Sequence, residues 1–139
     1  MATARELFLT YSLALNDHNV AAAAALFAED GVLDYPSLPS IGMAPNVVGR
    51  EAIHTFLADL LAQVPDFAFY DLEILIDTPD RLLAEYKIDA TMTTGRPFKQ
   101  HYGGFVTVSH GKIDLLREYL DNVHVARALL PEGTAGIPA

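Results

Sequence analysis

Residues 67–120 read FAFYDLEILIDTPDRLLAEYKIDATMTTGRPFKQHYGGFVTVSHGKIDLLREYL, and apolar side chains recur there with a period of two. That alternation is typical of β-strands with one buried face. Short turn sequences interrupt it at residues 77–80, 94–97 and 110–111, so consecutive strands should be antiparallel neighbours. The pattern predicts four strands, at Phe67–Ile76, Arg81–Met92, Phe98–Ser109 and Lys112–Leu120.

The residues before this segment show the helical period instead. Leu7, Phe8, Tyr11 and Leu15 fall on one stripe of a first helix. The alanine-rich stretch from Val20 to about Ala28 predicts a second helix, and Ile53, Phe56, Leu57, Leu60 and Leu61 follow the pattern of a third.

Shorter segments complete the sequence-based prediction. Val32–Tyr35 is expected to form a short strand, and the proline-containing residues 36–45 a surface loop. Residues 122–130 should form a last helix, and residues 131–139 a mobile tail. Helices followed by a meander of strands predict one α+β domain over residues 1–139, in which a curved antiparallel sheet wraps three helices as a cone.

Composition excludes several function classes. The 139 residues carry 9 basic and 18 acidic side chains, for a formal charge of −9, which argues against binding to nucleic acid or to an anionic membrane surface. Cysteine is absent, so thiolate chemistry and disulfides are excluded. No apolar run approaches the roughly 20 residues of a membrane span, and no secretory signal is evident. We therefore expect a soluble, cytoplasmic domain.

Glu118 breaks the hydrophobic pattern of the last predicted strand. Alternation places it on the same face as Leu116 and Leu120. If that face is the inner one, burial should raise the pKa of the carboxyl group and suit it to proton exchange near neutral pH. The alternative is a carboxylate at the rim of the sheet that pairs with a neighbouring basic side chain.

Two other positions have both a structural and a functional interpretation. Gly103 and Gly104 interrupt a strand, either as a bulge or, at Gly104, as space left for a ligand. His54 lies at the edge of the third helix's apolar stripe and is either half-buried or part of a pocket. The histidines show no metal-binding spacing, so no metal is expected. Motifs for dinucleotide binding, phosphoryl transfer and serine hydrolysis are absent from the sequence as well.

Three segments together resemble the nuclear transport factor 2-like superfamily. They are LTYSLALNDHNVAAAAALFAEDGVLDYP at residues 9–36, GREAIHTFL at 49–57 and GKIDLLREYLD at 111–121. This superfamily of α+β cones includes ketosteroid isomerases, SnoaL-like polyketide cyclases, limonene epoxide hydrolases and scytalone dehydratases. Residues 49–74 and 111–133 are most similar to the phenazine-biosynthesis A/B proteins.

For each of these related families, only some of the catalytic residues have a matching residue in this sequence. Glu118 falls on the acid/base residue of the phenazine proteins and on the catalytic carboxylate of the cyclases and epoxide hydrolases. Phe56 stands where the phenazine proteins have a histidine. Tyr35 falls on the isomerases' catalytic base and Gly104 on their oxyanion-stabilising acid, whereas Tyr11 matches their helix-1 tyrosine.

The resemblance and the pattern together predict a cofactor-free lyase, cyclase or isomerase with Glu118 as general acid/base. Its substrate would be an apolar cyclic or carbonyl compound; the alternative is a ligand carrier or dimerisation module without catalysis. Phe56, Tyr102 and Glu118 should line one cavity that opens near residues 36–45. The expected ligand-binding residues are Tyr11, Tyr35, His54, Phe56, Tyr102, Gly104, Leu116 and Leu120.

The resemblance also implies a homodimer formed through the outer face of the sheet. Alternation places Phe67, Phe69, Phe98 and Phe105 on one face of their strands, where a second copy of the chain would cover them.

Overall fold

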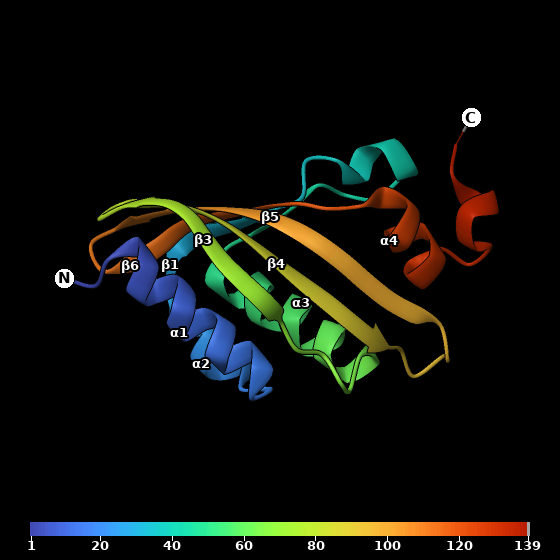
Figure 1. The fold of residues 1–139 in the computed structure, drawn as a ribbon, viewed down its shortest axis with the longest axis horizontal. Helices are drawn as coiled ribbons and strands as arrows, with labels where there is room; N and C mark the ends of the chain where they lie inside the picture. The colour runs from blue at the N-terminus through green and yellow to red at the C-terminus, as the bar shows by residue number, and fades with distance from the viewer. Residues whose placement is uncertain (139) are drawn as a thin grey trace.

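The computed structural model describes residues 1–138 as an α+β fold. Three helices lie on the concave side of a curved, unclosed sheet, and a fourth helix covers one end of it (Figure 1). The helices are α1 (Ala4–Asn16), α2 (Val20–Ala25), α3 (Arg50–Gln63) and α4 (Asn122–Leu129), with short 3-10 turns η1 (Leu38–Ile41) and η2 (Gly133–Gly136). The strands are β1 (Phe27–Asp34), β2 (Asn46–Val48), β3 (Tyr70–Thr78), β4 (Arg81–Thr91), β5 (Pro97–Ser109) and β6 (Lys112–Tyr119).

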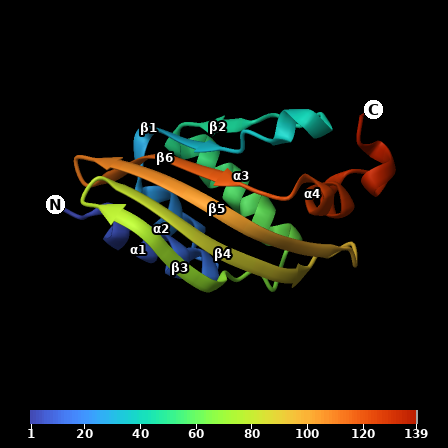
Figure 2. The same cartoon turned by 45° about the horizontal axis from the view of Figure 1, so that its top comes forward.

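All six strands belong to one sheet, in the order β2-β1-β6-β5-β4-β3. The meander from β3 to β6 is antiparallel, as the short turns predict. The pair β1–β6 is parallel, so the strand that precedes the meander joins the sheet in the opposite sense to the other pairs. Figure 2 shows β1 alongside β6 at the side of the sheet away from β3.

The second predicted helix is too long. The helix ends at Ala25, and residues 27–34 form β1, although alanine propensity predicts helix to about residue 28. The N–H of Ile113 donates to the carbonyl of Leu26 at 2.8 Å, and Phe27 lies opposite Ile113 in the sheet. Pairing with β6 therefore outweighs local helix propensity at these residues.

The core lies between the helices and the inner face of the sheet. Along β4 and β5 every second side chain is buried, as the period of two predicts. Along β6 the buried side chains are Ile113, Leu116 and Glu118, and the step of three residues coincides with a register shift against β5. Helix α3 contributes Ile53, Leu57 and Leu61, which are buried at successive turns. The side chains of Phe56 and Leu60 are only half-buried, because they border a pocket described below.

The predicted cluster of outward-facing aromatic residues is wrong for three of its four members. Phe67, Phe69 and Phe98 are buried in the core at 2%, 9% and 7% exposure. Because β3 begins only at Tyr70, strand alternation does not apply to Phe67 and Phe69. Phe98 and Phe105 have opposite parity along β5, so only Phe105 lies on the outer face.

No helix in residues 1–138 is long and apolar enough to cross a lipid bilayer.

Candidate functional site

Glu118 lies on the inner face of β6 and is only 4% exposed. Its strand neighbours across the sheet are small, because Glu118 pairs with Gly104 on β5 and Gly104 pairs with Ala84 on β4. Larger side chains from neighbouring elements therefore reach over these positions to the carboxyl group. Of the two interpretations left open by the sequence, the structure shows the buried one.

Tyr86 of β4 fills the space above Gly104. Its hydroxyl donates a hydrogen bond to Oε2 of Glu118 at 2.5 Å. A Cβ atom at position 104 would lie 2.7 Å from the Cε1 atom of Tyr86 and closer still to its hydroxyl. Position 104 therefore leaves room for a tyrosine and not for a ligand, and β5 has no bulge there. Both predicted interpretations of Gly104 are wrong.

Burial raises the pKa of Glu118 from 4.5 to about 7. Desolvation is the largest cause, since a carboxylate loses its hydration inside the core. Hydrogen bonds from Tyr86 and, more weakly, from Tyr35 lower the pKa again, and no basic side chain takes part. The carboxyl group is therefore divided between its neutral and ionised forms near pH 7.

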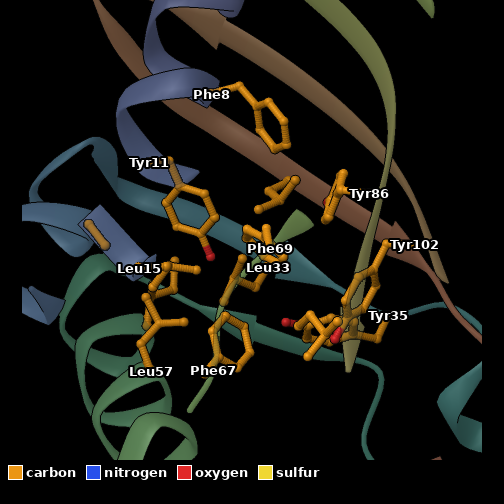
Figure 3. Close-up of a cluster of buried hydrophobic side chains, with 14 of the residues drawn as sticks. Phe8, Tyr11, Leu15, Leu33, Tyr35, Leu57, Phe67, Phe69, Tyr86 and Tyr102 are labelled. Carbon is orange, nitrogen blue, oxygen red and sulfur yellow. The ribbon is translucent and has the colours of Figure 1, made fainter. Parts of the chain in front are cut away.

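Four tyrosines surround this carboxyl group and stay protonated at neutral pH. The pKa of each is raised well above 10.0, chiefly by desolvation and then by the negative charge of Glu118. Tyr11 comes from α1, Tyr35 from the residue after β1, Tyr86 from β4 and Tyr102 from β5. Figure 3 shows the four rings within one cluster of buried side chains. Each phenol is thus a hydrogen-bond donor rather than a base.

An apolar pocket of about 360 Å³ lies between α3, α4 and the sheet. Aromatic and aliphatic side chains form most of its wall, and Asn46, Asp59, Gln63 and Gln100 add polar groups. The loop at residues 36–45 contributes Leu38, Met43 and Ala44, where the sequence predicted an opening. The other lining residues are Tyr35, Val47, Phe56, Leu60, Phe98, Tyr102, Leu120, Val125 and Leu129.

Tyr35 and Tyr102 belong both to the wall of this pocket and to the groups whose pKa the charge of Glu118 raises. Glu118 itself does not line the pocket, so the predicted cavity contains Phe56 and Tyr102 but not the carboxyl group. The ring of Tyr35 packs edge-to-face on Phe56 with centroids 5.9 Å apart, which holds the phenol in place.

Four predicted ligand-binding residues, Tyr35, Phe56, Tyr102 and Leu120, do line the pocket. Tyr11 and Leu116 are instead buried in the core at 2% and 0% exposure. His54 is exposed on α3 and borders a shallow groove beside α2. It does not line the pocket that Tyr35 and Phe56 share, because its place on the helix turns it away from the stripe that faces the sheet.

Sequence reasoning missed Tyr86. Its only signal is register: Tyr86 lies opposite Tyr102 on the inner face, two residues from Ala84 and hence diagonal to Gly104. Strand patterning indicates which side chains face inward, but it does not indicate which of them lie opposite one another on β4 and β5. A shift of the pairing by two residues would keep the same side chains inside. Over residues 1–138, no cluster of three or more histidine, aspartate or glutamate side chains is arranged to hold a metal ion.

Comparison with known proteins relates this fold to a family. The SnoaL-like domain model matches residues 8–115, a range that ends three residues before Glu118. A search of curated proteins found no match. Among solved structures, similar folds are those of NTF2-like and ketosteroid-isomerase-like proteins.

Three of these structures illustrate the similarity. A candidate isomerase from Bacillus subtilis has a TM-score of 0.78 at 21% identity, covering 96% of this chain and 93% of its own. A phenazine biosynthesis-related protein from Pseudomonas aeruginosa scores 0.77 at 20% identity, covering 98% and 86%. A candidate polyketide cyclase from Xanthomonas campestris scores 0.73 at 23% identity, covering 86% and 90%. At these identities the likeness establishes the fold.

Proposed function

Because the chain belongs to the SnoaL-like domain family, we propose that it is a cofactor-free isomerase, cyclase or lyase. Its substrate is a small apolar compound that is cyclic or carries a carbonyl group, and Glu118 is the general acid/base. The candidate isomerase and polyketide cyclase among the structures of similar fold support this class of reaction. A cytoplasmic location, expected from the sequence, is part of the same proposal.

The observation that carries the proposal is a buried carboxyl group with a pKa of about 7 behind an apolar pocket of about 360 Å³. A group half-ionised near neutral pH can take up a proton in one step and return it in the next. The pocket excludes water from most of a ligand's surface, and phenols at its inner end can hold a developing negative charge on oxygen.

Proton exchange at carbon tests this proposal without knowledge of the natural substrate. β-Tetralone in D₂O, followed by proton NMR, reports abstraction of the hydrogens next to its carbonyl group. The wild-type protein should accelerate their replacement by deuterium, and Glu118→Gln should reduce the acceleration about 100-fold or more, the usual size of a general acid/base contribution. Glu73→Gln, at an exposed glutamate of β3, is the matched control and should exchange like wild type.

One observation favours the second candidate, a ligand carrier without catalysis. The pocket is lined by Tyr35 and Tyr102 but not by Glu118. Phe56, which cannot transfer a proton, also lines it. A carrier would bind β-tetralone with an affinity that calorimetry detects, yet leave its exchange rate at the buffer value in wild type and in both variants.

A further inference from the structure

The hydroxyl of Tyr86 holds one particular oxygen of the buried carboxyl group. It donates to Oε2 of Glu118 at 2.5 Å, the short distance typical of an O–H donor bonded to a carboxylate. Both partners are enclosed, since Tyr86 is 0% and Glu118 is 4% exposed. Water has little access to either group, so neither readily exchanges this hydrogen bond for one to solvent.

The packing around Tyr86 fixes its phenol oxygen beside Oε2. The rings of Phe8, Phe69 and Tyr102 surround it with centroids 4.7 to 5.3 Å away, and Figure 3 shows it between Phe8 and Tyr102. The phenol also lies over Gly104, where a Cβ atom would collide with it. Neither the ring nor its hydroxyl therefore has room to turn toward another partner.

This arrangement decides where the proton of a neutral Glu118 is held. Among the side-chain hydrogen bonds of residues 1–138, the Tyr86 hydroxyl takes part only in the one to Oε2. If Oε2 carried the proton and donated it to Tyr86, the phenol hydrogen would be left in the core without an acceptor, which costs the hydration of that group. If Oε1 carries the proton, Oε2 is the carbonyl oxygen and still accepts from Tyr86.

We propose that Tyr86 is a positioning residue that confines the exchangeable proton of Glu118 to Oε1, by donating to Oε2 whether the carboxyl group is neutral or ionised. Gly104 is part of this arrangement, because a side chain there would displace the phenol. Tyr86 does not line the pocket, so it acts through Glu118 alone. The consequence for catalysis rests on the proposed function: a proton taken from a ligand, or returned to it, passes through Oε1.

The same hydrogen bond keeps part of Glu118 ionised at neutral pH. A hydroxyl donates more strongly to a carboxylate than to a neutral carboxyl group. The bond from Tyr86 therefore opposes the rise in the pKa of Glu118 that burial causes. Without this hydroxyl, a larger share of the carboxyl group would be neutral at pH 7, and less of it could act as a base.

No other group that faces Glu118 titrates in this range. The remaining titratable groups around it are Tyr11 from α1, Tyr35 after β1 and Tyr102 from β5. All three keep their protons because their pKa values are raised well above 10.0. No group of α3 or α4 in the described chain contributes to the pKa of Glu118, and Arg117, the preceding residue on β6, forms an ion pair with Asp34 at 2.7 Å.

Tyr86→Phe tests the proposal because it removes the hydroxyl and keeps the ring. Carbon-13 NMR of the Glu118 carboxyl group, with its signal assigned by Glu118→Gln, should give a titration midpoint about one pH unit higher in the variant. That is the difference between a hydrogen bond to a charged group and one to a neutral group. The rise of β-tetralone deuterium exchange with pH should move up equally. Tyr119→Phe, at a tyrosine of β6 that is 51% exposed, is the control and should titrate as wild type.

Infrared spectroscopy tests which oxygen carries the proton. At a pH below the titration of Glu118, subtracting the spectrum of the matching Glu118→Gln protein isolates the carbonyl stretch of the neutral group. With the proton on Oε1, the carbonyl oxygen Oε2 loses its donor in Tyr86→Phe, so the stretch should move to higher wavenumber. With the proton on Oε2, the carbonyl oxygen is Oε1 and the stretch should stay in place.

A midpoint that does not rise, or a stretch that does not move, overturns the proposal. A thermal melt establishes that each variant is folded. If Tyr86→Phe is not, Gly104→Ala displaces the phenol instead and should change both quantities in the same directions.

Failure of this proposal can be distinguished from failure of the catalytic one, because the NMR and infrared measurements need no ligand. A raised midpoint without Glu118-dependent deuterium exchange supports the role of Tyr86 and contradicts catalysis. Glu118-dependent exchange with an unchanged midpoint in Tyr86→Phe contradicts the role of Tyr86 alone.

Discussion

At the scale of single residues, the charge of Glu118 should make stability depend on pH. Its folded-state pKa of about 7 lies above the ordinary 4.5, so ionisation disfavours the folded state. The cost is absent below pH 4.5, grows between 4.5 and 7, and above 7 amounts to about 3 kcal/mol.

Glu118→Gln should remove this cost. In denaturant titrations, we expect the variant and wild type to match near pH 4.5, and the variant to be more stable by about 3 kcal/mol above pH 7. Because the two proteins share every other titratable group, the difference between their free energies of unfolding reports the titration of Glu118 alone. Equal stability at both ends of this range would mean that Glu118 is not desolvated, and would remove the main support for its catalytic role.

Gly104→Ala tests the close approach of Tyr86 to Glu118. The added methyl group would press on a phenol ring that is 0% exposed and cannot move outward, so we expect a loss of about 1 to 3 kcal/mol in the free energy of unfolding. The adjacent glycine is the control, because a Cβ atom at Gly103 would meet nothing nearer than 3.9 Å. Gly103→Ala should be neutral or stabilise by about 0.5 kcal/mol; similar losses at both positions would contradict this account of Gly104.

At the scale of elements, α4 is held over the pocket by its first residues. The carboxylate of Asp121 accepts hydrogen bonds from the N–H groups of Val123 and His124. The backbone of Asp121 exchanges two further hydrogen bonds with the side chain of Gln100, at 3.0 and 2.8 Å. Val125 and Leu129 of this helix form part of the pocket wall, so the cap supports the site.

Asp121→Ala should therefore destabilise the protein by about 1 kcal/mol and weaken the binding of pocket ligands. Hydrogen exchange should speed up at the amides of α4 before it does so in the sheet, since a lost cap opens the helix locally. Asp121→Asn keeps an accepting oxygen at the cap and should stay within a few tenths of a kcal/mol of wild type. Unchanged exchange in the alanine variant would show that the bonds of Gln100 to Asp121 and of Asn122 to Ser37 and Ser40 hold α4 without the cap.

At the scale of the whole molecule, the outer face of the sheet carries an uncovered apolar stripe. Ile76, Leu83 and Phe105 lie opposite one another on β3, β4 and β5, and Ile76 is 67% exposed. Beside this stripe, His101 lies 3.6 Å from Glu85, and Lys87 forms an ion pair with Asp71 at 3.6 Å. We propose that a second copy of the chain covers this stripe, in the dimer that the sequence resemblance implies.

Sedimentation at tens of micromolar should give the mass of a dimer. Ile76→Lys should shift it to a monomer with an unchanged far-ultraviolet circular dichroism spectrum, because an isolated lysine cannot be buried in an apolar contact without large cost. Leu13→Lys, at a residue of α1 that is 65% exposed, changes the charge equally and should leave the dimer intact. A wild-type monomer under these conditions would contradict the proposal.

The sequence by itself determined the fold class and placed Glu118 on the same face of β6 as Leu116; that this face is the inner one was decided by the structure. The alternation through Leu116, Glu118 and Leu120 has the period of two that is specific to β-strands. The short turns between consecutive strands require these strands to pair with each other. The wall residues Tyr35, Phe56, Tyr102 and Leu120 were likewise predicted, through the resemblance to a known family and the patterning together.

Only the tertiary structure decided what surrounds the carboxyl group. Pairing of β1 with β6 converted the end of an alanine-rich helix into strand, and the register of β4 on β5 brought the Tyr86 hydroxyl over Gly104 to Glu118. Tyr35, the residue after β1, and Tyr102 of β5 line the pocket, whereas Glu118 itself does not. Pairing register and side-chain reach depend on contacts between residues distant in the sequence, which local periodicity does not encode.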